Sequence, residues 1–127
     1  MSSLSMYLCA RDAARAIAFY KDVFGAVEIV APWIMPDGRV GHCELKFGET
    51  QVMIADEHPA EQVQAPSTLG GTTVQLYLRV DDVGAVFQRA VAAGCKVWRP
   101  VGRGPDGETV AKVQDPFGHN WFLVSER

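Results

Sequence analysis

The chain has 127 residues, 48% of them hydrophobic, and a formal net charge of −3. This length and apolar content suit a single packed domain and argue against a disordered protein. The acidic balance argues against a nucleic-acid binder, and no apolar run approaches the roughly 20 residues of a membrane-spanning helix.

The N-terminal residues and the cysteines indicate a cellular compartment. Met1 to Leu4 lacks the basic and apolar stretches of a signal peptide. Cys9, Cys43 and Cys95 are odd in number and form no C-x-x-C motif. We therefore expect small, buried, reduced thiols rather than nucleophiles, and a cytoplasmic protein.

The first half of the chain predicts a strand, a helix and three more strands. A strand pattern from Ser5 to Ala10 precedes a helical pattern from Asp12 to Phe24. Pro36-Asp37-Gly38 has turn chemistry between two apolar runs and predicts a hairpin. The strands expected after the helix are Glu28–Met35, Arg39–Phe47 and Gln51–Ala55.

The second half predicts the same order of elements. Gln75 to Val80 alternates polar with apolar residues, and an amphipathic helix follows. Asp82 is placed to cap this helix and Gly94 to end it. Its apolar stripe is Val83, Val86, Phe87, Ala90 and Val91. A loop is expected over Gly102–Gly107, and the last strands over Lys96–Val101, Glu108–Gln114 and Asn120–Val124.

The two halves are copies of one βαβββ unit, offset by about seventy residues. Tyr7-Leu8 matches Tyr77-Leu78, and Asp12 matches Asp82. Pro36-Asp37-Gly38 returns as Pro105-Asp106-Gly107. We expect one α+β domain over residues 1–127, with module 1 at 4–55, a linker at 56–71 and module 2 at 72–125.

Three glycines form a motif that has another common meaning. Gly102, Gly104 and Gly107 spell G-x-G-x-x-G, which binds dinucleotides where it opens a helix. Here Pro105 interrupts the motif and a strand pattern follows. We therefore interpret it as a hairpin loop without a phosphate role.

Several short motifs, taken in order, resemble the vicinal oxygen chelate superfamily over nearly the whole chain. The similarity is to its glyoxalase/bleomycin-resistance-like branch, typified by PhnB-like proteins. The motifs are Tyr7-Leu8, Phe19-Tyr20, Phe24-Gly25-Ala26, Pro36-Asp37-Gly38-Arg39, Leu69-Gly70-Gly71-Thr72, Tyr77-Leu78, Val80-Asp81-Asp82-Val83 and Asp115-Pro116-Phe117-Gly118-His119. The resemblance implies two curved sheets that form an open barrel around a ligand cavity, and a homodimer.

Strand alternation predicts which side chains face that cavity. Met6, Leu8 and Ala10 are the apolar set of the first strand and are expected under the helix. The cavity-facing set is then Ser5, Tyr7 and Cys9 in module 1, and Gln75, Tyr77 and Arg79 in module 2. We expect Arg79 to select ligands that carry a carboxylate or phosphate.

The family's metal-ligand positions indicate no metal ion and no other cofactor. The resemblance implies ligands on the first and fourth strands of each module, which carries them onto Ser5, Gln75 and Phe122. The fourth position falls among Val52, Met53 and Ile54. Gln75 alone offers a usual donor, and a divalent ion needs several.

Other polar and aromatic residues have two readings each. His42 and Glu44 share a strand face and suit either ligand contacts or acid/base chemistry. The candidate stacking surfaces are Trp33, Trp98 and Trp121, although a core or dimer-interface position is favoured for Trp121. His119 is interpreted as a turn residue. We interpret the Asp56–His58 segment as solvated linker rather than as a displaced metal site.

We therefore predict a metal-free protein that binds a small organic molecule in the barrel cavity. The alternative is a lyase, isomerase or dioxygenase of the superfamily with a displaced metal site or with acid/base residues. A third reading is an interaction module whose pocket has decayed. The predicted ligand-binding residues are Tyr7, Trp33, His42, Glu44, Gln75, Tyr77, Arg79 and Phe122.

Overall fold

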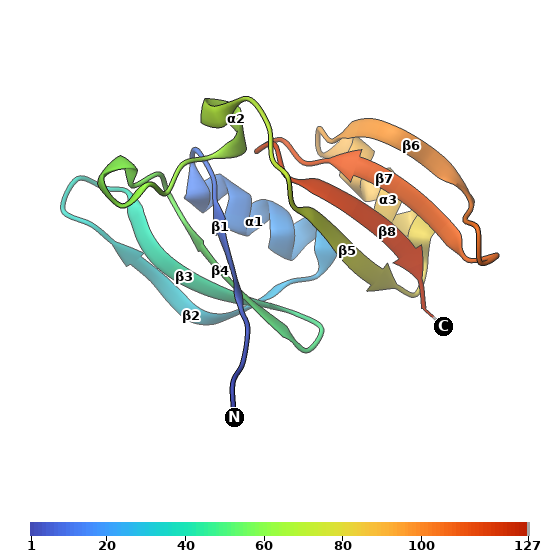
Figure 1. Ribbon diagram of the computed structural model, residues 1–127, viewed down its shortest axis with the longest axis horizontal. Coiled ribbons are helices and arrows are strands. Elements are labelled where there is room, and N and C mark those ends of the chain that lie inside the picture. Colours follow the sequence, from blue (N-terminus) through green and yellow to red (C-terminus); the bar gives the residue numbers. More distant parts are fainter. Residues whose placement is uncertain (127) are drawn as a thin grey trace. The chain divides into compact units, whose positions relative to one another are not determined.

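The computed structural model describes residues 1–126, which fall into two compact units. Unit 1 comprises Met1–Leu69, and unit 2 begins at Gly70. Each unit contains one four-stranded sheet and a helix packed against it (Figure 1). This confirms the predicted α+β fold of two βαβββ modules. Within residues 1–126 no helix combines the length and the apolar character that crossing a membrane requires.

Unit 1 places its first strand beside its last. Its elements are β1 (Met6–Cys9), α1 (Ala13–Phe24), β2 (Val27–Ile34), β3 (Val40–Phe47) and β4 (Thr50–Ala55). The sheet order is β1-β4-β3-β2, with β1 parallel to β4 and the other pairs antiparallel. Leu45, Ile54 and the Tyr20 ring of α1 are fully buried, because α1 covers one face of the sheet.

Unit 2 repeats this topology. Its elements are β5 (Gln75–Val80), α3 (Val83–Ala92), β6 (Lys96–Arg103), β7 (Thr109–Gln114) and β8 (Asn120–Ser125). The sheet order is β5-β8-β7-β6, again with one parallel pair, β5 with β8. Leu123, Val113 and Trp121 are buried on the face that α3 covers. The expected core position of Trp121 is thereby confirmed.

The register of the strands fixes which residues share a face. In unit 1, Tyr7 lies beside Met53, and Met53 lies beside Glu44. In unit 2, Tyr77 lies beside Phe122, and Phe122 lies beside Lys112. Leu8 and Leu76 point the other way and are buried, as the alternation predicts. Cys9 shares the face of Tyr7 but is also buried.

The turn between β2 and β3 and the turn between β6 and β7 confirm the repeat at atomic detail. The Gly38 N–H donates to the Met35 carbonyl at 2.9 Å, and the Gly107 N–H donates to the Gly104 carbonyl at 3.0 Å. Gly38 and Gly107 have φ angles of 91° and 81°, a region that favours glycine. The G-x-G-x-x-G segment therefore belongs to a hairpin, and a strand follows it as predicted.

Two local predictions were wrong. Gly102 and Arg103, expected in a loop, extend β6. Val91, expected on the buried stripe of α3, is exposed, because the helix buries Val83, Val86 and Ala90 instead. The expected linker contains a three-residue 3₁₀ helix and a four-residue α-helix.

The segment after β4 is attached to unit 1 at Asp56 and buries Ala65 and Pro66, while most of its other residues are exposed. It contains the 3₁₀ helix η1 (Pro59–Glu61) and the short helix α2 (Pro66–Leu69). The Asp56 carboxylate accepts hydrogen bonds from the Ala13 N–H at 2.8 Å and the Val40 N–H at 2.7 Å. Asp56 therefore joins the start of α1 to the start of β3, and the solvated reading of this residue was wrong.

The turn before β8 is built on one buried carboxylate. Asp115 is 3% exposed. Its Oδ1 accepts hydrogen bonds from the Phe117 and His119 N–H groups at 2.9 and 3.0 Å, and its Oδ2 accepts from Trp121 Nε1 at 2.9 Å. His119 is buried in this turn, which confirms its expected place as a turn residue.

We predict that Asp115→Ala lowers the free energy of unfolding by about 3 kcal/mol, because it removes a charged acceptor and leaves buried N–H groups without it. Urea denaturation followed by circular dichroism measures the change. Asp22→Ala, at an exposed position of α1, is the control and is expected to change stability by less than about 0.5 kcal/mol. Equal stability of the two variants would contradict the role of Asp115.

Candidate functional site

The face of the unit 2 sheet that α3 leaves uncovered carries polar and aromatic side chains in rows. One row runs Gln75, Asn120, Gln114 and Lys96 across the four strands. The next row runs Tyr77, Phe122, Lys112 and Arg99. The predicted residues Gln75, Tyr77 and Phe122 therefore lie together on one face. We call this surface the unit 2 open face.

Three cations on this face stack on three aromatic rings. The Arg79 guanidinium carbon lies 5.2 Å from the centre of the Tyr77 ring, which places both side chains on one face as predicted. Lys112 Nζ lies 4.8 Å from the Phe122 ring. Lys96 Nζ lies 4.2 Å from the Trp98 ring. Tyr77 and Phe122 also contact each other, with ring centres 5.7 Å apart.

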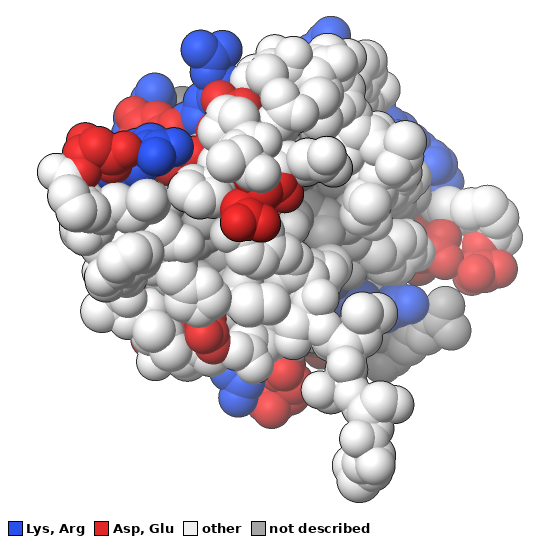
Figure 2. Space-filling view, turned by 60° about the vertical axis from the view of Figure 1, so that its left-hand side comes forward, with Lys and Arg blue, Asp and Glu red and all other residues white. Residues whose placement is uncertain are grey.

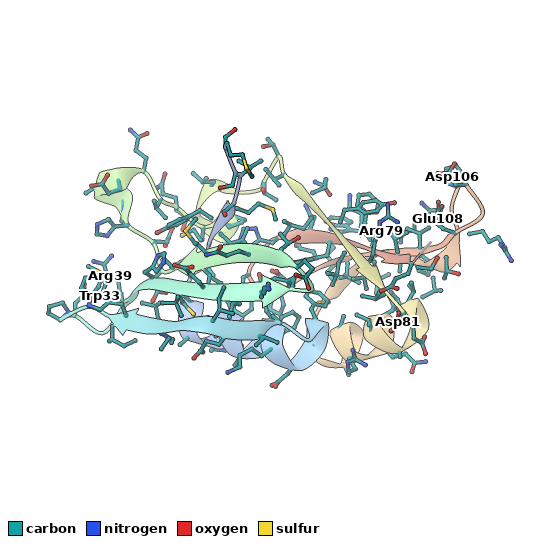
Figure 3. The ribbon with its side chains drawn as sticks, turned by 90° about the horizontal axis from the view of Figure 1, so that it is seen from below. Trp33, Arg39, Arg79, Asp81, Asp106 and Glu108 are labelled. Atoms are coloured by element: carbon teal, nitrogen blue, oxygen red, sulfur yellow. The ribbon has the colours of Figure 1, made fainter. Side chains whose placement is uncertain are left out.

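The charge of the unit 2 open face is one-sided. None of the strands β5, β6, β7 and β8 contains Asp or Glu. Among residues 1–126, Arg79, Lys96 and Lys112 form no salt bridge within 4.0 Å. Arg79 is exposed rather than enclosed. Figure 3 shows Arg79 on β5, whereas the labelled acidic side chains Asp81, Asp106 and Glu108 come from turns or from their ends.

Hydrogen bonds hold one edge of this face in place. Asn120 Oδ1 accepts from Trp98 Nε1 at 2.8 Å and from Gln114 Nε2 at 3.1 Å. The indole of Trp98 is thereby fixed beside Lys96. Trp98 was expected only as a candidate stacking surface, and Lys112 and Asn120 were not predicted as site residues. Alternation along β7 and β8 would have found Lys112 and Asn120, whereas Trp98 lies at an irregular register between β6 and β7.

The open face of unit 1 carries a different set. His42 Nε2 and Glu44 Oε2 are hydrogen-bonded at 2.6 Å. The other Glu44 oxygen accepts a hydrogen bond from the Gln51 side-chain amide. Glu44 is thus held from two sides, by a neighbour on its own strand and by one on β4.

Tyr7 and Trp33 line a pocket in unit 1 of about 90 Å³. Trp33 rests directly on the β3 backbone, because a Cβ atom at Gly41 would lie 2.5 Å from Cε3 of the indole. The tryptophan is therefore seated where only glycine leaves room. The other lining residues are Met35, Val40, Gly41, Ala55, Asp56, Glu57 and His58.

Comparison with known proteins gives the family. A family model described as Glyoxalase/Bleomycin resistance protein/Dioxygenase superfamily matches residues 4–123. The chain belongs to this superfamily. An uncharacterized protein of Mycobacterium bovis is 41% identical over 125 residues, which cover 95% of this chain and 81% of the relative.

Solved structures of this superfamily's fold are also similar. TioX from Micromonospora sp. ML1 is 28% identical, with a TM-score of 0.71 over 99% of this chain and 97% of that one. A PhnB protein from Bacillus cereus is 19% identical, with a TM-score of 0.75 over 98% and 100%. The fosfomycin resistance protein FosX from Mesorhizobium loti is 17% identical, with a TM-score of 0.71 over 99% and 92%. The last two share the fold with this chain.

The metal-ligand positions that the superfamily resemblance implies do not fit a divalent ion. The register resolves the fourth position: Tyr77 pairs with Phe122 and Tyr7 pairs with Met53, so Met53 is the counterpart of Phe122. The four positions are then Ser5, Met53, Gln75 and Phe122. They offer a hydroxyl, a thioether, an amide and a phenyl ring, whereas divalent ions in proteins are held mainly by carboxylate, imidazole or thiolate groups. Nor does any group of three His, Cys, Asp or Glu side chains suited to an ion occur within residues 1–126.

The three cysteines are buried and form no disulfide bond. Burial raises the pKa of Cys9 from 9.0 to about 11, and the carboxylates of Glu57 and Asp56 add to this rise. Burial, with a smaller effect of Asp115, raises the pKa of Cys95 to about 12. Both thiols therefore stay protonated at neutral pH and are poor nucleophiles there.

We predict that stability falls as the pH rises from 9 towards 11. The unfolded thiols lose their protons in this range while the folded ones keep them, so the unfolded state gains stability. Denaturation under reducing conditions at several pH values measures the slope. The double variant Cys9→Ala and Cys95→Ala is expected to flatten it, and an unchanged slope in that variant would assign the pH dependence to other groups.

Proposed function

We propose that the protein binds a small planar organic anion on the unit 2 open face, without a metal ion. The observation that carries this proposal is the set of three ring-stacked cations, Arg79, Lys96 and Lys112, on strands that contain no acidic residue. The ligand is of the class of aromatic carboxylates or phosphates. Membership in a superfamily that includes resistance proteins supports small-molecule binding.

Each part of such a ligand meets a matching group. A planar ring gains contact area on Tyr77 and Phe122, whose centres lie 5.7 Å apart. The Arg79 guanidinium can bind a carboxylate or phosphate on that ring through two hydrogen bonds. Lys112 adds a second positive charge beside Phe122. Gln75, in the adjacent row, supplies an amide for orientation.

A second candidate function is acid/base catalysis in unit 1. It is favoured by the 2.6 Å hydrogen bond between His42 and Glu44 and by the contact of Gln51 with the same carboxylate. A carboxylate fixed in this way orients an imidazole, as a general base requires. This candidate takes a bound small molecule as substrate, and its reaction needs no metal ion.

We predict that aromatic carboxylates raise the melting temperature of the protein and that Arg79→Ala or Lys112→Ala weakens their binding by about tenfold. Neutral amides of the same ring are expected to bind weakly to all forms. Thermal shift and calorimetric titration measure both. Equal affinity for the anion and the amide in the native protein would overturn the proposal.

Three controls separate the alternatives. Arg89→Gln removes a positive charge from α3, outside the open face, and is expected to leave anion affinity unchanged. Protein treated with a chelator is expected to bind as untreated protein does, and elemental analysis to find less than one divalent ion per chain. Chemical conversion of a bound anion that is lost in His42→Asn would favour the acid/base function instead.

We also propose that the protein is a cytoplasmic homodimer. Every residue of the edge strand β2 is at least partly exposed, although the strand is largely apolar. Ile29 and Ile34 are 45% and 54% exposed. Figure 2, which turns the left-hand side of Figure 1 forward, shows a broad area without charged side chains. A long, exposed apolar edge strand favours association with another chain. Because the superfamily resemblance implies a homodimer, we propose that a second copy of the protein covers this edge. Buried cysteines without a disulfide bond support a reducing compartment.

We predict a dimer at roughly tens of micromolar protein, a range where weak dimers still dissociate. Ile29→Lys together with Ile34→Lys is expected to give a monomer, because it places two charges in the proposed interface. Ala18→Lys, at an exposed site of α1, is the control and is expected to remain dimeric. Light scattering decides, and a monomeric native protein would overturn the proposal.

A further inference from the structure

The pocket of unit 1 is a built cavity with an aromatic wall. Trp33 is 60% exposed, yet its indole packs directly over Gly41, where any larger side chain would collide with the ring. Tyr7 and Met35 supply a second ring and a thioether to the same cavity. Figure 3 shows Trp33 and Arg39 near the β2–β3 turn, at one end of unit 1. Ring faces carry a negative partial charge and attract cations.

The charged groups that line the pocket are acidic. The lining includes Asp56 and Glu57 but neither Lys nor Arg. Glu57 is partly offset by Arg11, whose Nε lies 3.6 Å from Glu57 Oε1. Asp56 accepts two backbone hydrogen bonds and, within residues 1–126, forms no salt bridge with a cation.

The field of these two carboxylates reaches the neighbouring strand. After burial, Glu57 and Asp56 are the next causes that raise the pKa of the Cys9 thiol. The two carboxylates therefore act on β1 as well as on the pocket that they line. The unit 2 open face has the opposite sign, so the two sites call for different ligands.

We propose that the unit 1 pocket binds a small organic cation, namely an alkylammonium or methylated ammonium group. Such a group fits about 90 Å³, places its methyl or methylene carbons on the Trp33 and Tyr7 rings, and offsets the charge of Asp56. Gly41 is a positioning residue here, since it determines where the indole lies. The inference does not depend on anion binding in unit 2.

Choline and its neutral isostere 3,3-dimethylbutan-1-ol are the probes. Choline is expected to shift the indole N–H resonance of Trp33 in a saturable way, and the alcohol is expected to leave it unchanged. Titration with sodium chloride at the same ionic strength is the salt control. Trp33→Leu and Gly41→Ala are expected to weaken choline binding by about tenfold.

Matched variants keep the test independent of folding and of the anion site. Gly84→Ala in α3, where an added Cβ meets ordinary contacts, is the control for Gly41→Ala. Trp98→Leu and Arg79→Ala are expected to bind choline as the native protein does, and Trp33→Leu to keep its anion affinity. Equal binding of choline and the alcohol, or no saturable shift with choline, would overturn the inference. If anion binding fails while choline binding holds, the proposed function alone is wrong.

Discussion

Each unit depends on one helix that covers one face of its sheet. α1 and α3 bury alternate side chains of the central strands, β3 and β4 in unit 1 and β7 and β8 in unit 2, which holds the register of those strands. The same packing turns the remaining side chains to the uncovered face. The rows of polar and aromatic residues in unit 2 therefore follow from the apolar contacts on the other side of the sheet.

The repeat explains both what the two units share and where they differ. Their sheet order, parallel pair and hairpin turns correspond, because these features rest on matching apolar and turn residues. Side chains on the uncovered faces do not make these apolar or turn contacts, and they differ between the two units. Unit 1 carries a hydrogen-bonded acid–imidazole pair and an acidic pocket, whereas unit 2 carries ring-stacked cations. One scaffold thus presents two opposite charge preferences.

Periodicity was sufficient to predict most elements and the faces of Tyr77 and Arg79, since alternation and helical spacing are local signals. It did not predict contacts made by side chains that reach across loops. From the sequence alone, Asp56 was expected to be a solvent-exposed linker residue. In the structure it accepts hydrogen bonds from Ala13 and Val40, which are far away along the chain. The face of Trp98 could not be predicted from alternation, because the register of β6 is irregular there. Val91 continues the apolar spacing of α3 in sequence, yet it is exposed, because the helix buries only Val83, Val86 and Ala90.

The parallel pairing of first and last strands has a consequence for synthesis of the chain. Met6 of β1 pairs with Val52 of β4, and Gln75 of β5 pairs with Asn120 of β8. Each first strand is therefore made well before its partner leaves the ribosome, and it waits as an unpaired edge during that interval. Unit 1 completes its sheet while unit 2 is still being translated. The nascent chain thus has two separate periods in which an open strand is available to chaperones or to aggregation.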